Sequence, residues 1–239
     1  MPRPFRARPT RLRSHACSCV ARWKRSPTGR ERDRPVARLA RLSLAAAVLL
    51  LAACGGGGRG KAETENRCPT TGAHVTFPLL DPHEPHNVDV LTNLGEFAFR
   101  LDVQDSPCTT SSFAALVRKH FFDGTIFHRI VPGFVIQGGD PTGTGRGGPG
   151  YTVADVPPAN ALYTEGVVAM AKSSTEPRGS AGSQFFIVTG PDAGLPPDYA
   201  ILGVVTKGLK VVERIGRLGN RVTERPTRRV AVLRMTLTA

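Results

Sequence analysis

Apolar and polar residues alternate with a period of two along several short segments after residue 86. The clearest case is residues 88–101, where apolar side chains fall on every second position on both sides of a turn at residues 93–95. This pattern is typical of a β-hairpin that buries one face. We therefore predict two antiparallel strands at this place.

Other segments are short, apolar and rich in β-branched or aromatic residues, as buried strands are. They span residues 125–130, 166–171, 183–189, 199–205 and 228–238.

Two segments have the spacing of amphipathic helices instead. Residues 106–122 begin with a helix start signal, with Ser106 as N-cap and Pro107 at the first helical position. Residues 209–219 place apolar side chains on one side and end near glycines. Many short strands, two helices and glycine-rich connections predict a mainly β fold, a closed antiparallel barrel whose openings are covered by the helices.

The net charge of +13 at pH 7 would suggest a nucleic-acid-binding protein. However, residues 1–53 hold 13 Lys and Arg against 2 Asp and Glu, whereas residues 54–239 hold 19 and 17. Nucleic-acid binding would require the first 53 residues to survive in the mature protein. We therefore predict no nucleic-acid partner.

The apolar run of residues 42–53 explains why the front of the chain is expected to be removed. It follows two arginines, holds no charge and is too short to span a bilayer, for which a helix needs about 20 residues. It therefore fits the apolar part of a signal peptide. Its end, "LAAC" at residues 51–54, resembles a bacterial lipobox. The resemblance implies acylation of Cys54 and an extracytoplasmic lipoprotein anchored to the membrane; a plain secretory signal is the alternative.

We predict four parts in the chain. Residues 1–35 are a disordered basic leader, or they follow from a start codon assigned upstream of the true one. Residues 36–53 are the lipoprotein signal peptide, residues 54–85 a flexible linker and lead-in, and residues 86–239 the folded domain.

Two cysteines follow the predicted anchor, Cys68 and Cys108. In an exported protein we expect a disulfide between them, which would tie the N-terminal extension to the start of the first helix. Two free, buried thiols are the alternative.

The run "FHRIVPGFVIQGGD" at residues 127–140 places Arg129 among apolar neighbours. An unpaired buried charge is costly. We therefore interpret this apolar surface as the wall of a substrate pocket in which Arg129 is the strongly polar group.

Three segments in order resemble the signature blocks of the cyclophilins, the peptidyl-prolyl cis-trans isomerases. They are "FDGTIFHRIVPGFVIQGGDPTGTGRGGPGY", "GVVAMA" and "GSQFFIVT", and the resemblance runs from about Val88 to Thr238. It implies an eight-stranded antiparallel barrel with two capping helices and a proline pocket on its outer face.

The chemistry of this reaction asks for few groups. Rotation about an X–Pro amide has a barrier of roughly 18–20 kcal/mol because the nitrogen shares its lone pair with the carbonyl. A catalyst needs an apolar cup for the ring, a donor aimed at the twisted amide, and hydrogen bonds to the flanking backbone. These must favour the twisted state over both planar ones. No metal or cofactor is needed.

The resemblance also assigns roles to residues. It makes Arg129 the catalytic donor to the prolyl nitrogen and Gln137 a ligand of the substrate backbone that orients the arginine. We expect Arg129 to need no buried carboxylate partner, because solvent and substrate satisfy it. The apolar cup is formed by Phe134, Val135, Phe186 and Leu195.

The remaining assignments concern the rim of the pocket. Ala171 and Lys172 are expected on an edge strand that pairs with the peptide, and Gln184 supports the same side. Tyr199 stands where the family often has histidine, and Gly194 where a tryptophan is common. These departures predict weak inhibition by cyclosporin.

Three other patterns in the sequence could suggest a nucleotide site, an acid–base histidine or a metal site. The GxGxxG pattern at residues 143–148 is followed by Pro149-Gly150, so we expect a structural loop rather than a dinucleotide site. His128 is expected to face the barrel interior, because successive strand residues alternate. His83 and His86 lie in a proline-rich segment that we expect to be a solvated loop rather than a metal site.

The sequence thus predicts a monomeric, membrane-anchored isomerase that acts on proline-containing segments of exported proteins. The alternative is a module of the same fold that binds such segments without turnover.

Overall fold

The computed structural model describes residues 68–239. The predicted leader, the signal peptide and Cys54 lie outside these residues. The strands are β1 (Thr71–Gly72), β2 (Asn87–Thr92), β3 (Gly95–Leu101), β4 (Arg129–Val131), β5 (Val135–Gly138), β6 (Tyr151–Ala154), β7 (Val167–Met170), β8 (Ser180–Ala181), β9 (Phe185–Val188), β10 (Ile201–Lys207) and β11 (Val232–Thr238). The helices are α1 (Pro107–Arg118) and α2 (Leu209–Gly216).

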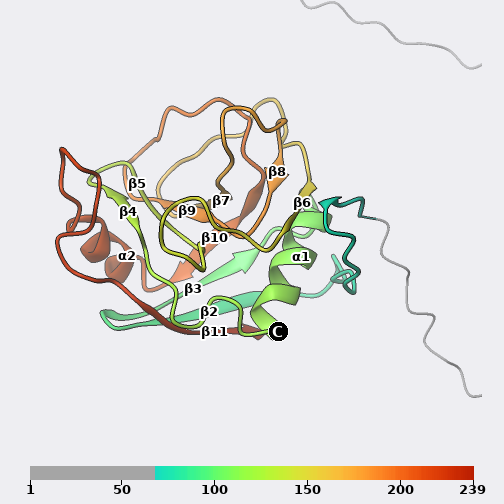
Figure 1. Cartoon of the computed structure of the whole chain (residues 1–239), viewed down its shortest axis with the longest axis horizontal. Helices are drawn as coiled ribbons and strands as arrows, with labels where there is room; N and C mark the ends of the chain where they lie inside the picture. Colours follow the sequence, from blue (N-terminus) through green and yellow to red (C-terminus); the bar gives the residue numbers. More distant parts are fainter. Residues whose placement is uncertain (1–67) are drawn as a thin grey trace, which may run out of the picture. The chain divides into compact units, whose positions relative to one another are not determined.

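Eight of the strands form one antiparallel sheet in the order β11-β2-β3-β10-β7-β9-β5-β4. The predicted hairpin is present as β2 and β3, which pair from Asn87 opposite Arg100 to Thr92 opposite Gly95. The sheet curls strongly, with the two helices on different sides of it (Figure 1). β1, β6 and β8 form a separate small sheet.

The prediction of a closed barrel is wrong, because the sheet is an open, strongly curled half-barrel with β11 and β4 at its edges. β4 has only three residues, and the chain facing it is the loop between α2 and β11, where the Ile130 amide donates to the carbonyl of Glu224. Pro226 in this loop has no backbone N–H and so cannot donate a hydrogen bond to a neighbouring strand. Isolated contacts, such as the bridge between Ile126 and Ala231, connect the two edges instead.

Helix α1 starts where the sequence predicts, with Pro107 as its first residue. The Ser106 side chain makes no capping hydrogen bond. Instead, the carboxylate of Asp155 accepts a hydrogen bond from the Thr109 amide at 2.6 Å. A carboxylate at this end is favourable because the first amides of a helix lack intrahelical partners. None of the helices in residues 68–239 is long and apolar enough to cross a membrane.

The main core lies between the concave face of the sheet and helix α1. Phe113 of α1 stacks on Phe122 at 4.6 Å between ring centroids and meets Phe185 of β9 edge-on at 5.6 Å. All three rings are fully buried. This core fixes the positions of β5, β7 and β9, whose opposite faces carry the candidate site.

Residues 68–80 pack onto this core, although the sequence suggested a lead-in with little periodicity. Cys68, Phe77 and Leu80 are buried. Cys68 forms a disulfide with Cys108 in α1, and the Leu80 amide donates to the Ser111 hydroxyl at 3.0 Å.

Candidate active site

Arg129 and Gln137 face each other across the β4–β5 pair. They are directly opposed in the strand register, and Nη1 of Arg129 donates to Oε1 of Gln137 at 3.4 Å. The arginine side chain is 35% exposed, so the guanidinium remains open to solvent and to a ligand. The structure therefore brings together the two residues assigned to catalysis.

A chain of side-chain amides continues from this pair. Nε2 of Gln137 donates to Oε1 of Gln184 at 3.1 Å, and Nε2 of Gln184 donates to the carbonyl of Gly147 at 2.9 Å. Each amide in the chain is thus oriented by its neighbour. Gln184 also contacts Ala171, whose amide donates to the Gln184 carbonyl at 2.9 Å, so it lies next to both Gln137 and the exit of β7.

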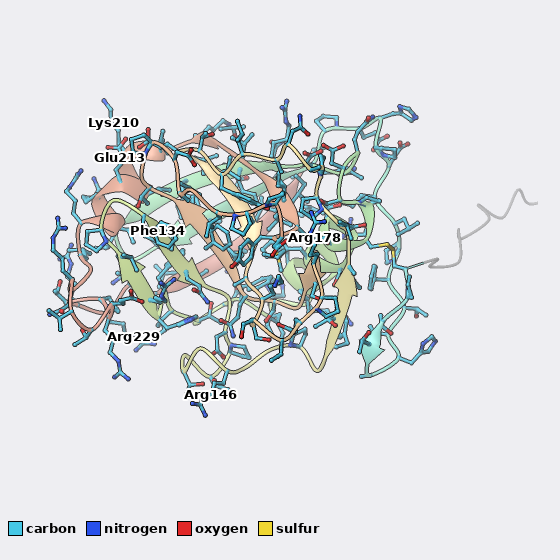
Figure 2. The ribbon with its side chains drawn as sticks, turned by 90° about the horizontal axis from the view of Figure 1, so that it is seen from above. Phe134, Arg146, Arg178, Lys210, Glu213 and Arg229 are labelled. Carbon is cyan, nitrogen blue, oxygen red and sulfur yellow. A yellow bond between two sulfur atoms is a disulfide. The ribbon has the colours of Figure 1, made fainter. Side chains whose placement is uncertain are left out.

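The predicted apolar residues form a second cluster, separate from the main core. Alternate residues of a strand face opposite sides, so Val135 and Phe186 belong to this cluster while their neighbours belong to the core. The other predicted members pack against it from loops: Phe134, Ala171, Leu195 and Tyr199. Phe134, labelled in Figure 2, is partly buried. Val135 and Phe186 are buried beneath these partly buried residues, and the cluster includes Val135 of β5, the strand that carries Gln137.

Tyr163 is a member of this cluster that the sequence did not reveal. It is 1% exposed, and its hydroxyl donates to the carbonyl of Tyr199 at 2.7 Å and accepts from the Tyr199 amide at 3.1 Å. The rings of Tyr199 and Phe186 then meet edge-on, with centroids 5.6 Å apart. Burial raises the pKa of Tyr163, which keeps its hydroxyl protonated as the donor. Tyr163 therefore holds Tyr199 in place against the cup.

Arg129 has a carboxylate partner at the surface, which leaves the expectation that it needs no buried carboxylate uncontradicted. Its Nε donates to Oε2 of Glu224 at 2.6 Å. Glu224 is 95 residues away in sequence and has a left-handed backbone, with φ of 56°. Its side chain is 45% exposed, so the pair lies at the surface. No local sequence pattern connects these two residues, so their contact was not predicted.

The assignment of Ala171 and Lys172 to an edge strand is also wrong. They follow β7, which lies inside the sheet between β10 and β9, and the Ala171 amide donates to the carbonyl of Gln184 at 2.9 Å. Lys172 places its Nζ 5.5 Å from the centre of the Tyr199 ring. Both residues border the site, but they do so as the exit from a central strand.

His128 does not face the barrel interior. Phe127 and Ile130 are both fully buried, so residues 127–130 depart from strict alternation and His128 is only partly buried. A Cβ atom added to Gly145 would lie 3.5 Å from its Nε2, which places the ring next to the glycine-rich loop. Burial lowers the pKa of His128. The charge of Asp140 raises this pKa and the charge of Arg129 lowers it further, so the pKa lies below its ordinary value.

The glycine-rich loop that follows Asp140 is irregular and opens no helix, as the Pro149-Gly150 pair after its GxGxxG pattern predicted. Asp140 is fully buried and accepts from the Thr142 amide at 2.7 Å and from the Gly145 amide at 2.6 Å. Burial by itself raises the pKa of Asp140, but the hydrogen bonds from Thr142, Gly147 and Gly145 outweigh it and hold the pKa well below its ordinary value. The loop is therefore organised by one buried carboxylate.

A hollow of about 700 Å³ lies between this loop and the exit of β7. Its lining includes Gln137 and Gln184, and it is completed by Thr71 and Gly72 of β1. Arg146 belongs to the same loop, and Figure 2 shows its side chain pointing away from the sheet. The hollow is thus continuous with the amide chain of the site. Within residues 68–239, no group of three His, Cys, Asp or Glu side chains is placed to hold a metal ion.

A partly exposed guanidinium near an apolar cluster, with two side-chain amides next to it, suits an enzyme that twists a neutral amide bond. The family described as "Cyclophilin type peptidyl-prolyl cis-trans isomerase/CLD" matches residues 87–237. The chain belongs to this family and is a cyclophilin-type peptidyl-prolyl isomerase.

Individual relatives agree with this assignment. The chain is 37% identical over 154 residues to a peptidyl-prolyl cis-trans isomerase of Arabidopsis thaliana. The match covers 63% of this chain and 92% of the relative. It is 36% identical over 158 residues to the human peptidyl-prolyl cis-trans isomerase-like 1. This match covers 64% of this chain and 93% of the human protein.

A solved structure is similar as well. It is a cyclophilin-type isomerase of Cryptosporidium parvum, crystallised in the presence of the dipeptide Ala-Pro, with 30% sequence identity and a TM-score of 0.59. The match covers 64% of this chain and 99% of the other.

Proposed function

We propose that this chain is a membrane-anchored, extracytoplasmic prolyl isomerase that assists the folding of exported proteins. Slow X–Pro isomerisation can limit folding, and an isomerase needs no ATP. The lipobox-like residues 51–54 support the anchor. The disulfide between Cys68 and Cys108 supports an oxidising compartment, because such bonds are rare in the cytosol.

Arg129 is the catalytic residue of the proposed mechanism. Twisting the X–Pro bond removes amide resonance and localises a lone pair on the prolyl nitrogen. A guanidinium has five N–H groups, and in residues 68–239 Nε and Nη1 make its side-chain contacts to Glu224 and Gln137. Further donors are therefore free to point at the developing lone pair. Because a planar amide nitrogen offers no such lone pair, this hydrogen bond favours the twisted state.

The apolar cluster holds the proline ring while the bond rotates. Val135 and Phe186 are its buried members, and Phe134 and Leu195 are partly buried residues packed against them. The Ala-Pro dipeptide used with the Cryptosporidium parvum relative supports a proline-containing ligand here. Gln137 is oriented by Gln184 and offers its amide to the backbone next to the proline. The single observation that carries the proposal is the position of Arg129 opposite Gln137, next to this cluster.

Isomerisation of a proline tetrapeptide by the purified protein tests the catalytic role. We expect Arg129→Ala to lower kcat/KM by about 10²–10³, the usual cost of losing a donor aimed at transition-state charge. Arg129→Lys should restore only part of the activity, because it keeps the charge and loses the planar fork. If both variants turn over at the wild-type rate, Arg129 is not catalytic; if the wild type binds the peptide without turnover, the chain is a binding module.

Intact-mass measurement on protein from its native membrane tests the anchor. We expect a mature chain that begins at Cys54 and carries acyl groups. Cys54→Ser should abolish acylation. The protein should then leave the membrane fraction, because stable anchoring needs two acyl chains and the variant would carry none. An unmodified chain that begins elsewhere would contradict the lipoprotein assignment and leave the isomerase assignment intact.

A further inference from the structure

Residues 68–80, which we name the strap, lie before the part of the chain that matches the family. The family match begins at residue 87, yet Thr71 and Gly72 of the strap line the hollow beside the isomerase site. One wall of this hollow is therefore built by residues from outside the family's own domain.

The strap is held against β6 and the end of the glycine-rich loop by backbone pairing. Thr71 pairs with Thr152 and Gly72 with Tyr151. The Ala73 amide donates to the carbonyl of Gly150 at 3.0 Å. Gly72 has a φ of 93°, and a Cβ atom at this position would lie 2.7 Å from the Gly150 carbonyl oxygen. Glycine is required here because the two backbones approach closely in a left-handed conformation.

Both ends of the strap are fixed to the domain. Cys68, three residues before Thr71, is bonded to Cys108 at the start of α1. At the other end, Phe77 stacks on Tyr151 with ring centroids 6.5 Å apart, and Leu80 is buried. The wall made by Thr71 is thus held between a covalent bond and an apolar contact.

The hollow lies where a bound peptide must pass. Gln137 and Gln184 contribute to both the active site and the hollow, and so does Ala171. A proline seated on the apolar cluster therefore places a neighbouring residue of the same peptide at the hollow. The other lining residues are largely glycines and hydroxyl-bearing residues, including Thr152, Ser173 and Ser183. This lining suits a polar side chain.

We propose that the strap is a specificity-determining element in which Thr71 contacts a polar substrate side chain flanking the X–Pro bond. The disulfide between Cys68 and Cys108 holds this wall in place. The proposal rests on the isomerase function and adds to it a subsite wall that comes from the N-terminal extension.

Charge variants at Thr71 test the wall. Isomerisation is measured by NMR exchange on alanine-rich proline peptides that carry Glu, Lys or Ala two residues before or two residues after the proline. In one of these two series, we expect Thr71→Lys to raise the ratio of the Glu-peptide rate to the Lys-peptide rate by about three- to tenfold, and Thr71→Glu to lower it similarly. Thr76 is exposed in the same strap and does not line the hollow, so Thr76→Lys and Thr76→Glu should leave the ratio unchanged.

Removal of the disulfide tests whether it holds the Thr71 wall in place. Cys68→Ser with Cys108→Ser, added to Thr71→Lys, should return the ratio to within about twofold of the wild-type ratio, the scatter expected where no charge pair remains. A ratio that stays shifted would refute the role of the disulfide. If the Thr71 variants change the ratio no more than the Thr76 variants in both series, the wall has no role. Failure of the wild type to accelerate the Ala peptide would instead refute the isomerase function.

Discussion

At the scale of single residues, Glu224 is the contact that most changes how Arg129 is understood. Its carboxylate fixes Nε of the arginine, and its backbone carbonyl accepts a hydrogen bond from Ile130, the next residue of β4. Glu224 in turn is held by a hydrogen bond from its own amide to the carbonyl of Asn220 at 2.8 Å. The loop thus holds β4, the short strand that carries Arg129, the proposed catalytic residue.

Substitution of Glu224 should therefore act through Arg129. We expect Glu224→Ala to lower kcat about three- to tenfold with little change in KM, since a loosened arginine spends less time aimed at the twisted amide. The effect stays modest because both partners are partly exposed. Steady-state kinetics with the proline tetrapeptide measures it.

Glu224→Gln is the control for this prediction. Its amide oxygen can still accept from Nε, so it should recover most of the lost kcat, and neither variant removes the backbone contact with Ile130. A rise in KM at constant kcat would show that Glu224 binds substrate rather than positioning the arginine.

The sequence allowed the prediction of some of these residues and not of others, for a physical reason. Arg129 and Gln137 lie eight residues apart in one signature block and face each other across a hairpin. Glu224 and Tyr163 act through contacts between distant parts of the chain. Such contacts leave no local periodicity, and only the loop-forming Asn220, whose side chain accepts from two following amides, hints at an ordered turn.

At the scale of elements, the glycine-rich loop depends on one buried carboxylate. Asp140 accepts amide hydrogen bonds from Thr142 and Gly145, and a Cβ atom at Gly147 would collide with it. Because its pKa in the folded protein lies below its unfolded value of about 3.9, the ionised carboxylate stabilises the fold above that pH. This contribution is lost as the pH falls below about 4 toward the pKa in the folded state.

Replacement of this carboxylate gives a pH-dependent prediction. Asp140→Asn should lower the free energy of unfolding at pH 7 by about 1–3 kcal/mol, because an amide cannot accept all of these hydrogen bonds. The difference from wild type should shrink as the pH falls below 4. Urea unfolding at pH 7, 5 and 3 measures this.

Asp105 offers a matched control, since it is exposed. Asp105→Asn should change the stability by less than about 0.5 kcal/mol at every pH, as surface substitutions usually do. An Asp140→Asn difference that stays constant from pH 7 to pH 3 would show that the carboxylate charge is not what organises the loop.

Most elements followed from local pattern, while their neighbours in the sheet did not. The hairpin of β2 and β3 has a clear alternation and turn, and α1 has proline at its first position, so both were found. The pattern of β7 does not say which strands flank it, so its exit at Ala171 was placed on an edge when it follows a central strand. A three-residue strand such as β4 is too short to show a clear alternation of apolar and polar residues.

At the scale of the whole molecule, barrel closure and the N-terminal extension both depend on long-range contacts. Composition and turn signals predicted a mainly β fold with two helices, but they could not show that a proline-containing loop faces the free edge of β4. Similarly, residues 68–80 have little periodicity, yet three of their side chains are buried in the core. The disulfide was predicted because an exported protein reaches an oxidising compartment. The structure shows that it joins residues 68–80 to helix α1.

The disulfide gives a prediction for the stability of the whole domain. It joins residues 40 apart in sequence, and closing a loop of this size in the unfolded chain stabilises the folded state by about 3–4 kcal/mol. Cys68→Ser with Cys108→Ser should therefore lower Tm by about 10 °C, at roughly 2–4 °C per kcal/mol for a domain of this size. Differential scanning calorimetry measures the shift.

Reductant supplies the control for this prediction, because it acts on the bond without changing the core. Dithiothreitol should lower the Tm of the wild type toward that of the double serine variant and leave the variant itself unchanged. If wild-type protein from its native compartment melts at the same temperature with and without reductant, the two thiols are not bridged there. The physical support for an oxidising, extracytoplasmic location would then be gone, while the assignment of the chain to the cyclophilin-type isomerases would stand.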